Sequence, residues 1–412
     1  MFVTRISLIQ LIFTILFLTS IQIFSQQNQF FRTEGKEIVD PSGKPVLLRG
    51  INLGNWLNPE GYMFLFEKTS SAMRIDEMFR ELVGPEETDK LWETFRKNYI
   101  TEKDIRFIKQ CGLNSIRVPF NFRLFMKEQY PPVWEGPGFE MLDSVVTWSE
   151  RNELLVILDL HAAPGGQTGD NIDDSRGYPF LFESNDMQLL TIYLWQRIAE
   201  RYKNSKTVIG YDLLNEPIAH FHDVEKLNPL LEPLYKRIIH AIREVDPYHM
   251  IFIGGAQWNT NFQIFNESID YEAVYTFHTY WTPTDVSVIQ RHIDFRDKFN
   301  VPIWCGETGE NTNEWISAFR ETMETNNIGW CFWPYKKLDS DRGVVSIPKP
   351  EGWDDIIKFA EGDRTGFDKI RNARLDQQKA MQIMNEFLKN CLLENNNINK
   401  GYLEALGLSL QK

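Results

Sequence analysis

The sequence predicts an α/β protein built as a single (β/α)8 TIM barrel, and three observations support this prediction. Eight short apolar runs alternate with longer segments of helical periodicity along the 412 residues. The runs are rich in Val, Ile and Leu, which is typical of parallel strands that are covered on both faces. Polar and aromatic residues recur at the C-terminal ends of these runs, where the loops of such a barrel gather. An open doubly wound sheet is the alternative, but no glycine-rich phosphate loop follows the first run.

The eight predicted strands share an apolar composition and similar lengths. They are Pro45–Leu53, Ser115–Phe120, Leu154–His161, Val208–Asn215, Met250–Gly254, Val274–Tyr280, Val301–Gly306 and Gly329–Trp333. Between them, periodic apolar positions predict helices over Glu102–Gln110, Met187–Lys203 and Pro233–Val245. Ahead of the first strand, Phe30–Val39 and Lys44–Arg49 flank Asp40-Pro41-Ser42-Gly43, a sequence that suits a type I turn. We therefore expect a small N-terminal hairpin that caps the bottom of the barrel.

The first 25 residues carry the pattern of a secretory signal peptide. Arg5 precedes an apolar run over Ile6–Leu18, and the small residue Ser25 precedes a polar segment. The run is short for a membrane span, although an uncleaved anchor is the alternative. We expect a signal peptide over 1–25, a catalytic barrel over 26–395 and a C-terminal tail over 396–412. The mature protein is expected to be a monomer that is secreted, periplasmic or attached to the cell surface, with no transmembrane span.

Composition excludes several classes of protein. Hydrophobic residues make up 42% and charged residues 25%, which argues against a disordered chain. The net charge of −13 argues against a nucleic-acid partner. The four cysteines show no CxxC pair and no metal-ligand spacing, so we predict neither a metal site nor a cofactor. We interpret Cys305 and Cys331, which lie inside apolar runs, as buried free thiols.

Two glutamates stand where an acid is expensive to bury. Glu216 follows the fourth run and Glu307 follows the seventh. A buried acid costs several kcal/mol (about 2–7 for a polar group) unless it is partnered or functional. Two such acids facing one cavity could break a glycosidic bond, with one protonating the leaving oxygen while the other attacks the anomeric carbon or activates water. The alternative is that each glutamate binds an arginine at a loop mouth.

Seven motifs, in order over about residues 30–340, resemble those of glycoside hydrolase family 5. They are Arg49-Gly50-Ile51-Asn52-Leu53-Gly54-Asn55-Trp56, Ile116-Arg117-Val118-Pro119, Asp159-Leu160-His161, Leu214-Asn215-Glu216-Pro217, His278-Thr279-Tyr280, Gly306-Glu307 and Phe332-Trp333. The resemblance implies a retaining mechanism with Glu216 as acid/base and Glu307 as nucleophile, about 5–5.5 Å apart. Glu216 then needs a raised pKa, whereas Glu307 must stay ionised.

The resemblance also implies roles for the residues around this pair. Arg117 and Tyr280 match the positions that hold the nucleophile, and Asn215 matches the residue that binds the sugar 2-hydroxyl. His161 and His278 match histidines that line the same sugar subsite, and Trp333 matches its aromatic platform. Asp159 is expected to orient Arg117 or His161. Thr308 and Glu310 depart from the family pattern, and we expect Glu310 to face solvent.

Two loop motifs point to the substrate. Leu53-Gly54-Asn55-Trp56 and the segment His161–Gln167 resemble the exo-β-1,3-glucanase branch of the family. We therefore expect a neutral β-glucan as partner, with β-1,3 linkages favoured over β-1,4. Further sugar contacts are expected from Asn55, Trp56, Trp258 and Trp281, and His220–Asp223 is expected to form a loop wall. A β-mannanase, a transglycosylase and a non-catalytic glycan-binding barrel remain as alternatives.

Overall fold

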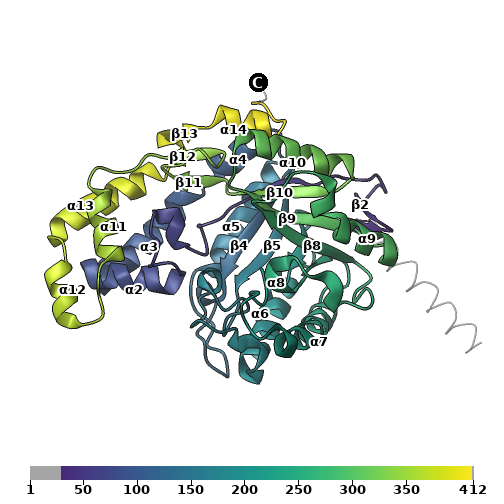
Figure 1. Cartoon of the computed structure of the whole chain (residues 1–412), viewed down its shortest axis with the longest axis horizontal. Coiled ribbons are helices and arrows are strands. Elements are labelled where there is room, and N and C mark those ends of the chain that lie inside the picture. The colour runs from purple at the N-terminus through teal and green to yellow at the C-terminus, as the bar shows by residue number, and fades with distance from the viewer. Residues whose placement is uncertain (1–28, 411–412) are drawn as a thin grey trace, which may run out of the picture.

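A computed structural model describes residues 29–410 of the chain (Figure 1). The predicted signal peptide lies outside these residues. Eight parallel strands close into a barrel in the order β10-β3-β4-β5-β6-β7-β8-β9, which confirms the predicted fold. The strands are β3 (Arg49–Asn52), β4 (Ser115–Asn121), β5 (Leu155–Ala162), β6 (Val208–Asp212), β7 (Met250–Gly254), β8 (Ala273–Tyr280), β9 (Ile303–Gly309) and β10 (Gly329–Trp333).

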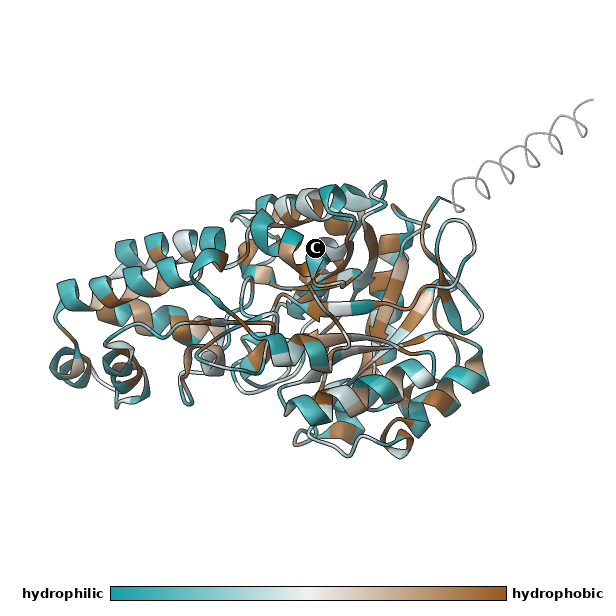
Figure 2. Cartoon of the chain, turned by 90° about the horizontal axis from the view of Figure 1, so that it is seen from above, coloured by the Kyte–Doolittle hydropathy of each residue, from teal (hydrophilic) through white to brown (hydrophobic). Residues whose placement is uncertain are grey.

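Helices surround the barrel and follow its strands. They are α2 (Ala72–Val83), α3 (Pro85–Tyr99), α4 (Glu102–Gln110), α5 (Gly138–Arg151), α6 (Asn185–Tyr202), α7 (Val224–Arg243), α8 (Ala256–Asn259), α9 (Gln290–Phe299) and α10 (Asn313–Thr325). The apolar colour in Figure 2 concentrates on the strands and on the inner faces of these helices. The prediction for α4 is confirmed to the residue, whereas α7 begins nine residues before the predicted Pro233. Pro233 and Pro229 both lie inside this helix, so it begins before the apolar positions on which the prediction rested.

The lower half of the barrel is filled with apolar side chains. Phe252, Val274 and Trp304 from the strands pack there with Ile38 and Leu48, which enter from the N-terminal segment. The predicted hairpin therefore does cap the barrel bottom, but its main turn differs from the prediction. Strands β1 (Arg32–Glu34) and β2 (Glu37–Val39) pair around Gly35, and the predicted second arm is reduced to a single bridge between Val39 and Pro45. Because the bottom is apolar, the polar groups of the barrel interior are left to its C-terminal end.

A group of helices extends to one side of the barrel. Helices α11 (Trp353–Glu361), α12 (Phe367–Ala373) and α13 (Gln377–Asn390) lie beside α2 and α3, at the left of Figure 1. Aromatic rings join these distant parts of the chain, since the ring of Phe387 in α13 lies 6.1 Å from that of Phe95 in α3 and 4.7 Å from that of Trp353 in α11. No helix among the described residues is long and apolar enough to cross a membrane.

The C-terminal segment packs on the barrel rather than hanging free. Residues 397–406, which we assigned to a tail, form β13 (Asn397–Ile398) and α14 (Lys400–Ala405). Strand β13 joins β11 (Lys336–Leu338) and β12 (Val345–Ile347) in a three-stranded sheet. Tyr402 and Leu403 are buried, so the apolar positions of this short segment carry its attachment. All four cysteines are buried and free, as predicted for Cys305 and Cys331.

Candidate active site

A cleft of about 560 Å³ opens at the C-terminal ends of the barrel strands. Eight of the predicted catalytic or sugar-binding residues line it: His161, Glu216, Trp258, His278, Tyr280, Trp281, Glu307 and Trp333. Arg117 and Asn215 lie directly beneath it, fully buried and in contact with one another. The structure thus brings together residues that are separated by more than 200 positions in the chain.

A bulge in β9 aims Glu307 into the cleft. Phe277 pairs with Cys305 and His278 with Glu307, so Gly306 is skipped in the register with β8. A single inserted residue of this kind re-aims the side chains that follow it. A side chain at Gly306 would come within 2.3 Å of the Thr276 hydroxyl, so glycine is needed for this close approach. The glycine before the nucleophile candidate therefore has a structural explanation.

Two donors hold the Glu307 carboxylate. Arg117 Nη1 donates to Oε1 at 2.5 Å, and the Tyr280 hydroxyl donates to Oε2 at 3.0 Å. Burial pushes the pKa of Glu307 up, but attraction to His278, Arg117 and His161 outweighs it and holds this pKa below its usual value. Glu307 is therefore kept ionised, which a nucleophile requires.

Glu216 reaches the cleft from a turn that follows β6. Its φ of +46° is unusual for a residue with a side chain, and such strained positions cluster at functional sites. His278 Nδ1 lies 2.8 Å from Glu216 Oε1, and its other ring nitrogen is 3.1 Å from Asn259 Nδ2. Asn259 ends a left-handed turn over residues 257–259, which places it behind the imidazole. The orientation of Glu216 is thus set through His278.

The two carboxylates lie close together across the cleft. One oxygen of Glu216, one ring nitrogen of His278 and one oxygen of Glu307 all lie within 4.8 Å of one another. Retaining glycosidases place their two carboxyl groups about 5–5.5 Å apart, whereas inverting enzymes need about 6.5–9.5 Å. The observed spacing matches the retaining arrangement.

Arg117 organises the floor of the cleft. Besides Glu307, its guanidinium contacts Asp212 at 2.8 Å and Asp159 at 3.0 Å, and it donates to the Asn215 side-chain oxygen at 2.8 Å. Burial raises the pKa of Asp212 to about 7, against the opposing attraction of Arg117. Removing a charge from any of these partners would therefore change the charge state of the whole floor.

His161 connects this floor to the wall of the cleft. Its Nδ1 lies 2.8 Å from Asp159, so Asp159 orients both His161 and Arg117. Burial alone would lower the pKa of His161, but Asp159, Glu60 and Glu307 outweigh it and raise this pKa to about 10. The ring also stacks on Trp333, with centroids 5.6 Å apart and an interplanar angle of 12°.

Trp333 lies at the end of β10 and is fixed from two sides. Its indole nitrogen donates to the Tyr62 hydroxyl at 2.6 Å. Its ring also covers Gly54, where a side chain would come within 2.5 Å of the indole. A flat ring held in this way can cover the apolar face of a sugar, while neighbouring polar groups bind its hydroxyls.

The sequence of this chain matches a known family over more than half its length. The sequence model described as Cellulase (glycosyl hydrolase family 5) matches residues 80–339. The chain belongs to glycoside hydrolase family 5. It is an O-glycosyl hydrolase of the glucanase or glucosidase type, since several curated relatives are named for these activities.

Two relatives and two solved structures illustrate the range of this family 5 resemblance. A β-xylosidase from Phanerodontia chrysosporium is 33% identical over 357 residues, 78% of this chain and 73% of the relative. A glucan 1,3-β-glucosidase from Lachancea kluyveri is 31% identical over 349 residues, 80% of this chain and 79% of the relative. A rutinosidase from Aspergillus niger has a TM-score of 0.58 at 16% identity, covering 71% of this chain and 90% of that one. Cel5A from Thermotoga maritima, solved with cellobiose, has a TM-score of 0.52 at 19% identity and covers 88% and 97%. These structures support the barrel fold.

The family 5 cleft contains a third carboxyl group that sequence reasoning missed. Glu60 is 3% exposed, and its Oε1 lies 3.6 Å from His161 Nε2 but makes no hydrogen bond within the described part of the chain. Burial raises the pKa of Glu60, against the opposing effect of His161. Glu60 Oε1 can accept a hydrogen bond from a sugar hydroxyl. Glu60 does not lie at the end of a predicted strand, so no strand pattern indicated that its side chain faces inward.

Two predicted contacts do not line this cleft. Asn55 is buried behind it, where its side-chain oxygen accepts a hydrogen bond from the backbone N–H of Glu60 at 2.9 Å. Trp56 points the opposite way and donates its indole N–H to the Arg96 carbonyl at 2.8 Å. The left-handed φ of +68° at Asn55 turns the chain here, so that proximity to a strand end did not place Trp56 in the cleft.

Other expectations for the family 5 cleft are corrected or supported by the structure. Glu310 does not face solvent: it lines the cleft and forms an ion pair with Lys337, because a φ of +50° turns it back over the opening. Thr308 is buried and its hydroxyl donates to the Thr279 carbonyl. His220 lines the cleft and accepts a hydrogen bond from the Trp258 indole, consistent with a loop wall. Trp281 lines the cleft rim with 71% of its surface exposed.

Only one group in the described residues has the spacing of a metal site. It consists of Glu216, His278 and Glu307 themselves. Arg117 and Tyr280 already donate hydrogen bonds to Glu307, and His278 is hydrogen-bonded to Glu216. The absence of a metal or cofactor therefore stays a prediction.

Proposed function

We propose that this protein is a secreted retaining hydrolase of β-glucans, in which Glu216 is the acid/base and Glu307 the nucleophile. The observation that carries the mechanism is their spacing, because one oxygen of Glu216 and one oxygen of Glu307 lie within 4.8 Å of each other. An inverting enzyme needs room for a water between its base and the sugar, and this spacing leaves none.

In the first step, Glu307 attacks the anomeric carbon of a sugar that lies on Trp333. The bond between that carbon and the glycosidic oxygen breaks, and the proton of Glu216 passes to the departing oxygen. Arg117 and Tyr280 keep the attacking carboxylate ionised and oriented until the glycosyl ester forms. Positive charge that develops on the sugar ring is stabilised by the Glu307 carboxylate that approaches it.

In the second step, water replaces the departed aglycone. Glu216, now a carboxylate, accepts a proton from this water as its oxygen attacks the anomeric carbon, and the ester bond to Glu307 breaks. The product leaves with the configuration of the substrate. A sugar hydroxyl in place of water would give transglycosylation instead.

The β-1,3 preference rests on sequence similarity. A relative at 31% identity is named as a glucan 1,3-β-glucosidase, and the loop motifs at residues 53–56 and 161–167 resemble that branch. A relative at 33% identity is named as a β-xylosidase, so β-xylosides are the second candidate substrates. Secretion is proposed from the composition of residues 1–25, and N-terminal sequencing of the exported protein tests it.

Product analysis tests the proposal. Purified enzyme is incubated with laminari-, cello-, xylo- and manno-oligosaccharides, and the anomer released first is identified by NMR. We expect fastest cleavage of laminari-oligosaccharides with the β anomer released first. Initial release of the α anomer would contradict the retaining mechanism, and faster turnover of another glycan would overturn the linkage preference.

Variants separate the two glutamates. Glu216→Ala should lower kcat on oligosaccharides by about 10²–10⁴-fold but spare glycosides with activated aryl leaving groups, which need no proton. Glu307→Gln should abolish turnover of both substrates. The exposed Glu200→Gln is the matched control and should keep wild-type rates. Equal losses on both substrates in Glu216→Ala would contradict its role as acid.

A further inference from the structure

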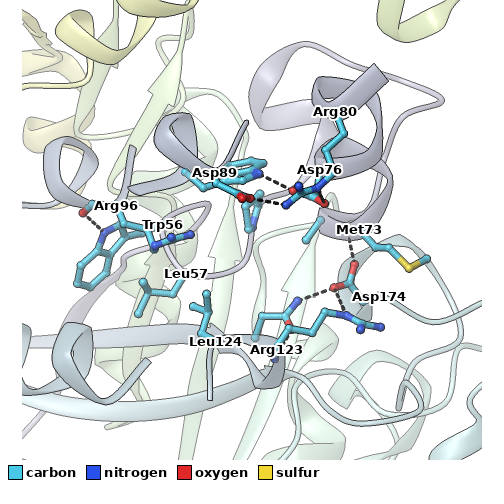
Figure 3. Close-up of a pocket in the computed structure, with 14 residues that line it drawn as sticks. Trp56, Leu57, Met73, Asp76, Arg80, Asp89, Arg96, Arg123, Leu124 and Asp174 are labelled. Atoms are coloured by element: carbon cyan, nitrogen blue, oxygen red, sulfur yellow. Dashed lines mark hydrogen bonds and ion pairs between the residues drawn. The ribbon is translucent and has the colours of Figure 1, made fainter. Parts of the chain in front are cut away.

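A second pocket lies behind one wall of the catalytic cleft. It encloses about 510 Å³ between α2, α3 and the turn at residues 122–124 (Figure 3). Apolar groups form its walls, including Trp56, Leu57, Met73, Trp92 and Leu124. Pockets of about 300–1,000 Å³ are the usual size for small-molecule ligands. None of the residues assigned to catalysis lines it.

Almost all polar groups of this pocket satisfy one another. On one side, Asp76 accepts hydrogen bonds from Arg80 at 2.7 Å and from the Trp92 indole at 2.9 Å, and Arg80 also reaches Asp89 at 2.6 Å. On the other side, Asp174 accepts from the backbone N–H of Met73 and from the Asn121 side chain, both at 2.7 Å. Figure 3 shows these contacts on opposite sides of the opening.

Arg96 is the exception. Its guanidinium points into the pocket beside Trp56, yet no hydrogen bond or ion pair among the described residues involves it (Figure 3). The residue is partly buried, and this burial lowers its pKa despite the attraction of Glu93, Asp76 and Asp89. A guanidinium offers five N–H donors in a planar fork that matches a carboxylate. A partly desolvated cation without a partner is costly, and a bound anion would reduce that cost.

The remaining charges select the kind of anion. Asp76 and Asp89 are paired with Arg80, and Asp174 is paired with Arg123, so Arg96 is the one lining cation without a partner among the described residues. A dianion such as phosphate would exceed the single positive charge that Arg96 offers. A single carboxylate balances Arg96. The apolar walls suit the flat faces of a ring.

We propose that this pocket is a second carbohydrate-binding site, which takes a sugar bearing one carboxylate, a hexuronate unit, with that carboxylate on Arg96. The site does not depend on the proposed hydrolysis, because it involves none of the catalytic groups. Binding is measured without turnover, so a failure here leaves the proposed function untouched.

The partition between the pocket and the cleft is a connected element. Asn58 donates to the Ile172 carbonyl at 2.9 Å and accepts a hydrogen bond from Asn121 at 2.9 Å. Pro59 and Asp174 face the second pocket, whereas their neighbours Glu60 and Ile172 face the cleft. An acidic side group of a glycan and its neutral backbone could therefore be held on the two faces of one wall.

Calorimetric titration with D-glucuronate, D-glucose, acetate and inorganic phosphate tests the proposal. We expect glucuronate to bind at least tenfold more tightly than each of the other three. Arg96→Gln should weaken glucuronate binding at least tenfold, while Arg151→Gln, at an exposed arginine, should leave it unchanged. Leu124→Trp, which fills the pocket and keeps Arg96, should also abolish binding, and it replaces Arg96→Gln if that variant does not fold.

Each contrary outcome is decisive. If acetate bound as tightly as glucuronate, the sugar ring would not contribute to binding. If phosphate bound as tightly, the preference for a single carboxylate would be wrong. If glucose bound as tightly as glucuronate, the contact between Arg96 and the carboxylate would not contribute to binding. Undetectable glucuronate binding, or wild-type binding by both pocket variants, would overturn the site.

Discussion

Two buried cations in this protein have opposite surroundings. Lys336 and Arg117 are both fully buried. The Lys336 ammonium contacts one carboxylate, Asp104, at 2.7 Å and donates to the backbone carbonyls of Tyr99 and Cys391 at 2.7 and 2.8 Å. Its three donors and its single charge are thus matched. Arg117 instead serves three carboxylates at the floor of the cleft.

The difference separates a structural site from a functional one. The Lys336 cluster joins the ends of α3 and α13 to β11 with its charges balanced, so it can only stabilise the fold. The Arg117 cluster sets three carboxylates against one guanidinium and the His161 ring, and among the described residues Asp212 Oδ1 and Glu60 Oε1 have no hydrogen-bond partner. One of these carboxylates lies where a glycosidase needs it, beside an anomeric carbon that becomes positive in the transition state. Imbalance in a buried cluster therefore marks the functional end of this barrel.

The largest expected effect comes from breaking the balanced cluster. Lys336→Met leaves Asp104 buried without its cation and should lower the free energy of unfolding by about 3–5 kcal/mol. Urea denaturation measures this loss, and kcat of the folded enzyme should not change. The double variant Lys336→Met/Asp104→Leu should recover most of the loss, except for the cap that Asp104 gives to α4, worth about 0.5–2 kcal/mol. A double variant no more stable than the single one would show that the pair does more than neutralise its own charges.

The matching change in the unbalanced cluster should act on rate. Arg117→Lys keeps the charge but loses the planar fork that contacts three carboxylates at once. Glu307 is then held less firmly, and a misplacement of about 1 Å can cost about 10²-fold in kcat. Steady-state kinetics measure this change, with circular dichroism as the check on folding. Wild-type kcat in this variant would remove the positioning role of Arg117.

A third test uses the fact that His161 titrates. Its pKa in the folded protein, about 10, lies above the ordinary value of 6.5, so its contribution to stability is complete below pH 6.5 and is lost as the pH rises toward 10. Between pH 6.5 and pH 8, the stability advantage of wild type over His161→Gln should fall by about 2 kcal/mol, at about 1.4 kcal/mol per pH unit. Urea denaturation at both pH values measures it. A constant difference would place the pKa of His161 near its ordinary value.

The sequence was sufficient to predict the barrel and the two glutamates that meet in its cleft. Buried parallel strands are apolar throughout, so polar residues at their C-terminal ends stand out, and Glu216 and Glu307 were found in this way. The same rule failed at Trp56, because a left-handed residue reverses the chain just after the strand. It could not find Glu60, which lies in a loop where no alternation or register indicates which side chains face inward.

The helices outside the barrel were also beyond prediction from the sequence. Their contacts join α2 and α3 to α11 and α13, some 300 residues later, through rings such as Phe95 of α3 and Phe387 of α13. Such pairings depend on tertiary packing and leave no local periodic signal. Residues 397–406 were assigned to a tail for the same reason, since only a few apolar positions attach them.

The smallest expected effects come from one deletion made in both clusters. Tyr335 and Tyr280 each donate a hydroxyl hydrogen bond of 3.0 Å to a carboxylate, Asp104 in one cluster and Glu307 in the other. Tyr335→Phe should lower the free energy of unfolding by about 1.5 kcal/mol and leave kcat unchanged, because the donor is lost where charge is balanced. Tyr280→Phe should lower kcat, and loss of a donor to the ionised form should raise the pKa of Glu307. The acidic limb of the kcat/KM profile should then move to higher pH, while stability changes by less than in Tyr335→Phe. If both variants lost stability alike and neither moved the pH profile, the contrast between the balanced and the unbalanced cluster would not hold.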